Sequence, residues 1–462
     1  MEQGSINPYL VPGPAGLGFN NRSLNMGHNI NRRTFLKQGA VAGAGLTFLK
    51  SGMAAGQSPH NKLNIAVIGI GDRGKQNLKA VSSENIVALC DVDKNNLADA
   101  AKQFPLAKTY IDWRECLEQK DIDAVVCSTT DHTHAFINIW VMNRGLHVYC
   151  EKPLANSVHE ARMVRKCYQK NKHRVATQMG TQIHASENFR RVVELIRHGA
   201  IGKVKKVSLW CNRTPKGGSY LPEAGPVPDH IDWDLWIGPS PMHPYNPGYF
   251  GNCLKWNYFW DFSSGQIGDM GSHVIDMAYW ALGLRFPTSC QAKGSPLSSD
   301  TCPQWLVADW EHPANDWRPA VTVHWFDGGK KPGMPSKIFN RDEMGLGGLF
   351  SGDKGWLLAG YDYRTIMFKD DMTYYQTPEK SELIPPSPGH HQEWIDACKT
   401  GKNTLCNFDY SGALIEHNLL ALVSYRLGQK IAWDAKNLKA TNCPAADQYI
   451  YKTYRQGWCL DG

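Results

Sequence analysis

The chain has 462 residues, 42% of them hydrophobic and 20% charged, which is enough for two domains with separate cores. Residues 1–57 hold five basic residues and one acidic residue, so the formal net charge of +7 leaves only about +3 for the rest. The remainder has no basic run that could follow a phosphate backbone and no apolar run near the ~20 residues that span a bilayer. These features argue against nucleic acid as a partner and against a membrane span.

Residues 1–60 are expected to be a disordered leader outside the fold. The stretch "NRRTFLKQGAVAGAGLTFLKSGMAAG" places Arg32 and Arg33 before a short, weakly apolar run rich in Ala and Gly. This pattern is typical of a twin-arginine signal and predicts a periplasmic or otherwise exported protein. A basic leader without a targeting role is the alternative. Because this export route carries folded proteins, a cofactor loaded before export is compatible with it.

Residues 61–180 alternate between apolar strands and amphipathic helices. Strands are predicted in "KLNIAVIGIG", "NIVALCDVD", 121–130 and 146–153, and helices at 93–104, 133–144 and 157–170. Such alternation is typical of βαβ units and predicts an α/β fold, a Rossmann domain with a doubly wound parallel sheet. Ser157 and Glu160 have the spacing of a capping box at the start of the last helix.

The alternation ends near residue 180. A helix and a strand are predicted in "ENFRRVVELIRHGAIGKVKKVSLW", followed by a loop-rich stretch over 212–262. Later apolar runs up to "YRTIMFKD" are expected to be antiparallel strands, and two late helices follow near 390–399 and 410–427. We therefore predict a second, α+β domain over 181–462, built on a large, open, mostly antiparallel sheet.

The turn "VIGIGDRG" has the G-x-G-x-x-G spacing of a dinucleotide fingerprint. It follows a predicted strand and opens a predicted helix, and the next strand ends at Asp91. Gly69 permits the tight turn, and Gly71 lets the backbone approach a pyrophosphate at the helix N-terminus. Asp91 is expected to accept hydrogen bonds from the adenosine ribose and to repel a 2′-phosphate, which favours NAD over NADP. A glycine turn that only packs a helix on a sheet is the alternative.

Other residues near the predicted carboxyl edge of the sheet are candidates for cofactor contacts. In and around the turn they are Asp72, Arg73 and Gly74, and in "STTDHTHAF" they are Thr129, Thr130, His132 and His134. Arg73 could meet either the pyrophosphate or a 2′-phosphate. Either histidine could instead cap the helix that follows.

Glu151 and Lys152 follow another predicted strand, in the tripeptide "EKP", and are expected to point toward the cofactor. Pro153 disfavours the α-region for Lys152. The alternative for these two charged neighbours is a surface ion pair, worth under about 1 kcal/mol.

The stretch "GQIGDMGSHVIDMAYW", residues 265–280, is apolar except for a polar stripe. In a helix Asp269, His273 and Asp276 fall at i, i+4 and i+7, on one face. Three interpretations are open at this point: a buried network, part of a metal site, or part of a catalytic site. The glycines are expected to let the chain turn tightly before the helix begins.

The glycine turn, "CDVD", "EKP" and "GQIGDMGSHVIDM" together resemble the Gfo/Idh/MocA oxidoreductases, over nearly the whole of residues 62–435. The resemblance implies hydride transfer between NAD and a hydroxyl-bearing carbon of a sugar, polyol or glycoside. It implies that Lys152, Asp269 and His273 are catalytic. It also implies that the antiparallel sheet forms homodimers or homotetramers.

The chemistry needs such residues, because loss of hydride from an alcohol carbon requires the hydroxyl proton to leave as well. His273 is expected to take that proton, Asp269 to orient the imidazole, and Lys152 to donate to the substrate oxygen. Asp276 either supports His273 or contacts substrate.

The substrate side is further predicted to include Gln178 and His184, from the resemblance, and Trp256 and Tyr258, which lie just before the catalytic stretch. Aromatic residues in such loops more often pack a core, and that is the alternative for this pair.

Three other functions compete with a dehydrogenase. Some exported relatives on this scaffold resemble glycosidases that keep NAD bound and recycle it through oxidation, elimination and reduction. A non-catalytic NAD-binding sensor is a second alternative, although it has no need of all three catalytic residues. A metal held by Asp269 and His273 is a third, but no other residues at diagnostic spacing complete the ligand set, so we predict no metal.

Overall fold

The computed structural model describes residues 62–333, 344–369, 371 and 373–460. The predicted leader with its arginine pair lies outside these residues. Within the described part no helix is long and apolar enough to cross a membrane. All thirteen cysteines fall in the described part, and each is free.

Six described strands form an entirely parallel N-terminal sheet in the order β3-β2-β1-β4-β5-β6. They are β1 (Asn64–Ile68), β2 (Asn85–Cys90), β3 (Lys108–Tyr110), β4 (Ala124–Cys127), β5 (His147–Cys150) and β6 (Thr177–Met179). The helices that connect them are α1 (Arg73–Ala80), α2 (Lys94–Gln103), α3 (Trp113–Cys116), α4 (Asp131–Asn143) and α5 (Val158–Asn171). This order confirms the predicted doubly wound sheet, whose topological switch point lies between β1 and β4.

Sequence reasoning missed β3 and β6, which have three residues each and are too short for a periodic signal. The predicted cap of α5 is present, since the Ser157 side chain accepts from the Glu160 N–H. The Glu160 carboxylate accepts from the N–H of Asn156, one residue earlier than a standard capping box requires.

The described residues form a second, nine-stranded sheet in the order β13-β12-β11-β7-β10-β9-β8-β14-β15. Its strands are β7 (Val204–Cys211), β8 (Ser289–Gly294), β9 (Leu306–His312), β10 (Val321–Asp327), β11 (Leu346–Gly352), β12 (Gly355–Ala359), β13 (Arg364–Phe368), β14 (Ile431–Asp434) and β15 (Lys439–Ala440). Only β7 and β10 pair in parallel, which confirms the mostly antiparallel prediction.

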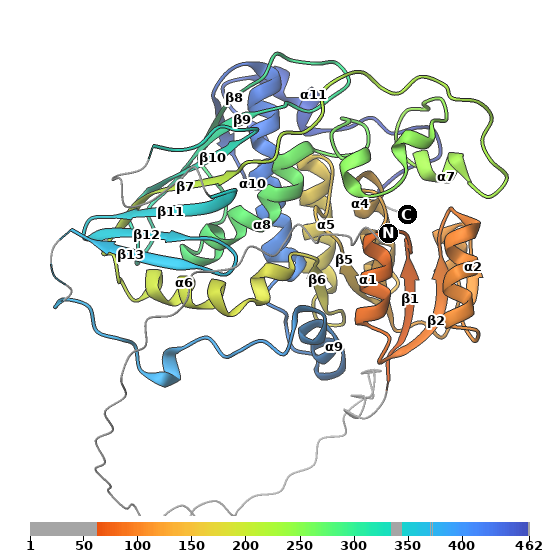
Figure 1. Ribbon diagram of the computed structural model, residues 1–462, viewed down its shortest axis with the longest axis horizontal. Coiled ribbons are helices and arrows are strands. Elements are labelled where there is room, and N and C mark those ends of the chain that lie inside the picture. The colour runs from red at the N-terminus through yellow and green to blue at the C-terminus, as the bar shows by residue number, and fades with distance from the viewer. Residues whose placement is uncertain (1–61, 334–343, 370, 372, 461–462) are drawn as a thin grey trace, which may run out of the picture. The chain divides into compact units, whose positions relative to one another are not determined.

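The remaining described α-helices are α6 (Glu187–Arg197), α7 (Trp233–Ile237), α8 (Gly265–Ala281), α9 (His390–Thr400), α10 (Phe408–Leu427) and α11 (Asp447–Ile450). Of these, α8 and α10 lie between the two sheets (Figure 1). Helix α10 packs on α5 and α8, whereas Trp394 and Ile395 of α9 enter the core around β1 and β4. A late segment of the chain therefore completes the N-terminal domain.

The glycines of α8 do not precede the helix, contrary to the prediction. The helix begins at Gly265, whose φ of +63° favours glycine, and Gly268 and Gly271 lie inside it. A Cβ at Gly271 would lie 3.4 Å from the Asn418 amide nitrogen of α10, which is ordinary van der Waals contact between the two helices.

A buried ion pair joins the two halves of the chain. The Arg162 guanidinium on α5 donates from Nε and Nη2 to the Glu416 carboxylate on α10, at 2.8 and 2.6 Å. The two side chains are 6% and 0% exposed, so neither charge has water as an alternative partner. The pair thus fixes α10, and with it α8, against the N-terminal domain.

We expect Arg162→Met to lower the free energy of unfolding by about 3 kcal/mol or more, because it leaves the Glu416 carboxylate buried and unpaired. The double variant Arg162→Met/Glu416→Leu should recover most of that loss, since apolar residues of similar size replace both charges. Urea denaturation of the two variants tests this, and equal losses in both would contradict it.

Candidate active site

Lys152 and Asp269 form an ion pair between the two domains. Lys152 follows β5, and its ammonium donates to Asp269 Oδ1 on α8. The second oxygen of Asp269 accepts from Arg213 Nη1 at 3.4 Å and from Asn257 Nδ2 at 3.3 Å. The Asp269 side chain is only 5% exposed, so these protein donors replace most of its water.

The pair stays charged at neutral pH. Burial favours the neutral amine of Lys152, but the neighbouring Asp269 carboxylate outweighs it and raises the pKa of Lys152. Burial likewise opposes the charge of Asp269, and Lys152 and Arg213 outweigh it, so the pKa of Asp269 is lowered. Lys152 is therefore a donor here and not a base.

His273 lies one turn after Asp269, but its ring is held by a different residue. The Thr181 hydroxyl donates to the Ser272 carbonyl at 3.2 Å, and its oxygen lies 3.3 Å from His273 Nδ1. We infer that Nδ1–H donates to Thr181, which leaves the lone pair on Nε2. The prediction that Asp269 orients the imidazole is wrong in this structure, because Nδ1 of the ring lies against Thr181 and the described hydrogen bonds of Asp269 go to Lys152, Arg213 and Asn257.

The imidazole of His273 is neutral. Burial, followed by the charge of Lys152, lowers its pKa to about 4. Nε2 has no hydrogen-bonding partner among the described residues. A neutral ring with an available lone pair can accept a proton.

Four residues of this cluster were not predicted: Thr181, Arg213, Asn257 and Tyr361. The Tyr361 ring lies edge-on to His273, with centroids 6.4 Å apart, and its buried hydroxyl has no hydrogen-bonding partner in the described part of the chain. Thr181 and Asn257 lie close in the sequence to residues that were predicted to belong to the site. The sequence pattern therefore marked the right stretches, but the neighbouring residues were chosen. Arg213 and Tyr361 are brought in by the second sheet, and no local pattern marks them.

Glu151 is buried, and the three hydrogen bonds it accepts all go to Oε1. Its side chain is 8% exposed, and it accepts from Arg73 Nε at 3.2 Å, Asn77 Nδ2 at 3.0 Å and Gln182 Nε2 at 2.8 Å. Burial opposes its charge, but Arg73 and Lys152 lower its pKa. The alternative interpretation, a surface ion pair between Glu151 and Lys152, is wrong because the Glu151 side chain is buried. Arg73, engaged by Glu151, joins the start of α1 to the end of β5.

The glycine turn fits a dinucleotide. Gly69 has a φ of +82°, and a Cβ there would lie 2.7 Å from the Ser128 backbone. A Cβ at Gly74 would lie 2.0 Å from the Gly69 carbonyl oxygen, so no larger residue fits. Around Gly71 a Cβ would meet only the Asn96 amide, at 3.2 Å, which leaves the backbone approachable. The exposed Asp72 precedes α1 and makes no side-chain cap.

Asp91 stands at the end of β2 beside this turn. One carboxylate oxygen accepts from the Ile70 N–H at 2.6 Å and the other from the Asp93 N–H at 2.9 Å. A carboxylate has about four acceptor sites, so two remain for ribose hydroxyls. The residues present therefore suit an adenosine ribose.

The residues after β4 divide into two groups. Thr129 and Thr130 are half-buried at the start of α4, and the Thr129 hydroxyl lies 2.7 Å from that of Thr133. His132 and His134 lie inside α4 and are buried, and their ring nitrogens lie 2.7–3.3 Å from backbone carbonyl oxygens. Neither histidine caps the helix or is available to a cofactor, so both of their predicted roles are wrong.

The residues predicted to face substrate lie in the protein interior. Gln178 is 0% exposed and donates to the His390 carbonyl. His184 Nδ1 lies 2.8 Å from Asp276 Oδ2, while Tyr410 donates to Asp276 Oδ1 at 2.6 Å. Asp276 therefore supports His184 and not His273, and its oxygens are already bonded to protein groups.

Trp256 and Tyr258 also pack inside. Both are at most 9% exposed and belong to an aromatic core with Trp233, Trp236 and Phe259. The alternative interpretation of core packing therefore describes them.

No ligand set completes a metal site at Asp269 and His273 among the described residues. In the described part of the chain, one group of side chains could hold an ion. It consists of Cys127, His134 and Cys150 and is buried between β4, β5 and α4. Both ring nitrogens of His134 already lie at hydrogen-bonding distance from carbonyl oxygens, which disfavours coordination.

Family models match both domains. The model described as oxidoreductase family, NAD-binding Rossmann fold matches residues 63–179, and the model described as oxidoreductase family, C-terminal alpha/beta domain matches residues 201–311. The chain belongs to the Gfo/Idh/MocA oxidoreductase family. Its N-terminal domain is an NAD-binding Rossmann domain.

Curated relatives of this Gfo/Idh/MocA protein act on polyols and sugars. It is 27% identical over 239 residues to levoglucosan dehydrogenase of Pseudarthrobacter phenanthrenivorans, which covers 48% of this chain and 51% of the relative. It is 31% identical over 144 residues to myo-inositol 2-dehydrogenase of Thermotoga maritima, covering 30% and 42%. The chain thus spans about half the length of these relatives, or less.

Solved structures share the fold over most of the chain. The dehydrogenase WlbA of Bordetella pertussis, in complex with NADH and UDP-GlcNAcA, superposes with a TM-score of 0.58 at 17% identity, covering 81% of this chain and 99% of that one. The aldose-aldose oxidoreductase of Caulobacter crescentus superposes with a TM-score of 0.56 at 16% identity, covering 81% and 100%.

We expect Asp276→Ala to lower the free energy of unfolding by about 2–4 kcal/mol, because His184 and Tyr410 lose their buried acceptor. NAD affinity should stay unchanged, since Asp276 touches no residue of the glycine turn. Thermal unfolding and nucleotide titration test this, with the exposed Asp396→Ala as the matched control. A stable Asp276→Ala that fails only in turnover would instead assign Asp276 to substrate.

Proposed function

We propose that the protein is an NAD-dependent oxidoreductase that moves hydride between the nicotinamide and a hydroxyl-bearing carbon of a sugar, polyol or glycoside. The observation that carries this proposal is the cluster of Lys152, Asp269 and His273 where the end of β5 meets α8. It combines a charged donor with a neutral base, and the oxidation of an alcohol needs both.

Each residue has a separate task in the oxidation of an alcohol. The Lys152 ammonium donates to the substrate oxygen and stabilises negative charge as it develops there. Nε2 of His273 takes the hydroxyl proton, while Thr181 holds the ring from the other side. Asp269 keeps Lys152 charged and in position, and Arg213 and Asn257 hold Asp269 itself. NAD, when bound, supplies the hydride acceptor.

NAD is the favoured dinucleotide in this proposal. A 2′-phosphate would approach the Asp91 carboxylate, and like charges at that distance repel. Arg73, the nearest candidate to compensate, is engaged by Glu151.

A second candidate is a glycosidase or lyase that retains NAD and restores it in each cycle. The observation that favours it is the arginine pair at Arg32 and Arg33, typical of an exported protein. Outside the cytoplasm there is no obvious supply of free NAD, so a retained cofactor would suit this setting. That the protein is exported is itself part of this proposal.

The two candidates separate in one experiment. The protein is purified without added cofactor, nucleotide is released by denaturation and identified, and the native protein is offered free sugars, polyols and glycosides. Turnover of a free sugar or polyol with formation of NADH supports the dehydrogenase. Glycoside cleavage without net NADH, lost when the nucleotide is stripped, supports the recycling enzyme. If the protein neither retains nor binds NAD, both candidates fail.

We expect Lys152→Met and His273→Ala each to lower turnover by roughly 10²-fold or more, because each removes a group that acts on the substrate hydroxyl. NAD binding should persist, since neither residue belongs to the glycine turn. The exposed Lys170→Met and His198→Ala serve as matched controls. Near-normal turnover in either catalytic variant would remove that residue from the mechanism.

A further inference from the structure

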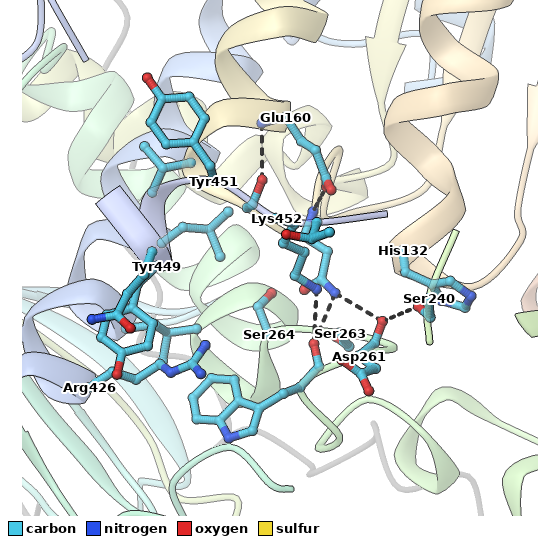
Figure 2. A pocket seen from close by; sticks show the side chains of 18 of the residues that line it. His132, Glu160, Ser240, Asp261, Ser263, Ser264, Arg426, Tyr449, Tyr451 and Lys452 are labelled. Atoms are coloured by element: carbon cyan, nitrogen blue, oxygen red, sulfur yellow. Dashed lines mark hydrogen bonds between the residues drawn. The ribbon is translucent and has the colours of Figure 1, made fainter. Parts of the chain in front are cut away.

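A second cavity lies apart from the catalytic cluster. Its volume is about 490 Å³, within the range of roughly 300–1,000 Å³ typical of small-molecule sites. The N-terminus of α5, the end of α10, residues 239–241, residues 260–264 and the segment 447–454 form its walls. Figure 2 shows its polar side chains converging from these elements. Lys152, Asp269 and His273 do not line it.

Two cations face this cavity. Nζ of Lys452 donates to the Trp260 carbonyl at 3.0 Å, which leaves two of its three donor positions. The Arg426 guanidinium lies over the rings of Trp260 and Tyr449, at 4.8 and 4.1 Å from their centroids. Within the described residues no carboxylate lies at ion-pairing distance from either cation. Both positive charges therefore lack a direct counter-charge.

Three carboxylates line the same cavity, and two of them have other partners. Glu160 accepts from the Asn156 N–H at 2.7 Å and from the Tyr454 hydroxyl at 3.1 Å. Asp261 lies 2.7 Å from His243 Nε2, and Asp447 is exposed. Burial lowers the pKa of Lys452, and the more distant Glu160 and Asp261 only partly oppose that effect. The ammonium is thus desolvated and incompletely compensated.

Hydroxyl groups complete the lining. Ser264 is 1% exposed, and its Oγ has no hydrogen-bonding partner in the described part of the chain. Tyr220, Ser240 and Ser299 add further hydroxyls. A buried hydroxyl without a partner is costly, so a ligand or an ordered water that bonds to Ser264 would stabilise this wall.

We propose that this cavity binds a small carboxylate that carries several hydroxyl groups, of the class of sugar acids. The carboxylate lies between Lys452 and Arg426, and the hydroxyls of the ligand bond to Ser264 and its neighbours. Glu160, Asp261 and Asp447 also line the cavity, so a phosphate dianion is repelled more strongly than a ligand with a single negative charge. Ser264 directly precedes α8, so the ligand contacts the start of the helix that carries Asp269 and His273.

The test is calorimetric titration of the full chain with D-glucuronate, D-glucose and inorganic phosphate. We expect one glucuronate per chain, with glucose and phosphate at least about tenfold weaker, because one lacks the charge and the other the hydroxyl pattern. Lys452→Met and Arg426→Gln should each weaken glucuronate binding about tenfold or more. The exposed Lys436→Gln and the catalytic His273→Ala should leave it unchanged.

Several results would overturn the proposal. They are no saturable glucuronate binding at millimolar concentration, equal affinity for glucose or phosphate, or unchanged binding in Arg426→Gln. Loss of binding in His273→Ala would place the ligand at the catalytic cluster instead. Thermal unfolding of each variant shows whether it is folded. Arg426 also lies at the cavity, and in the described part of the chain its guanidinium contacts the rings of Trp260 and Tyr449. Its variant therefore keeps the test decisive if Lys452→Met does not fold.

Discussion

The ion pair between Lys152 and Asp269 is the contact on which the candidate catalytic cluster depends. One partner stands at the carboxyl end of a parallel strand and the other on the helix between the sheets, so the pair exists only when both domains are folded and docked. Both charges are buried, and each is retained because the other lies beside it. The charge state of the cluster therefore depends on the docking of the two domains.

The same pair sets the state of His273. A positive charge nearby, added to burial, keeps the imidazole neutral, while Thr181 holds one of its nitrogens. Lys152 is thus kept as a donor and His273 as an acceptor. The pKa values of two groups that titrate several units apart in water have been moved further apart by one arrangement.

Buried polar residues around the cluster hold its elements in place. Glu151 joins α1, β5 and the segment after β6, and Asp276 joins α8 to His184 and α10. Arg162 and Glu416 connect α5 to α10. Through these contacts the groups hold in place the elements that carry Lys152, Asp269 and His273.

Sequence reasoning recovered the parallel sheet, the antiparallel sheet, the fingerprint glycines, and Lys152, Asp269 and His273, because these features rest on local periodicity and on short motifs. It assigned Glu151, His132, His134, Gln178, His184 and Asp276 to ligands because they are polar and lie near the motifs. Whether a polar side chain faces a ligand or a buried partner depends on residues far away in the chain, and no local pattern carries that information.

The sequence by itself determined the fold class of this protein and marked its candidate catalytic residues, since strand and helix periods and motif spacing are local properties. The tertiary structure alone decided which charges pair. It placed Arg213, Asn257 and Tyr361 beside the catalytic cluster, and it brought Arg426 and Lys452 together at a second cavity. The physical reason is that a buried charge takes its state from its nearest neighbours in space, and those neighbours come from distant segments of the chain.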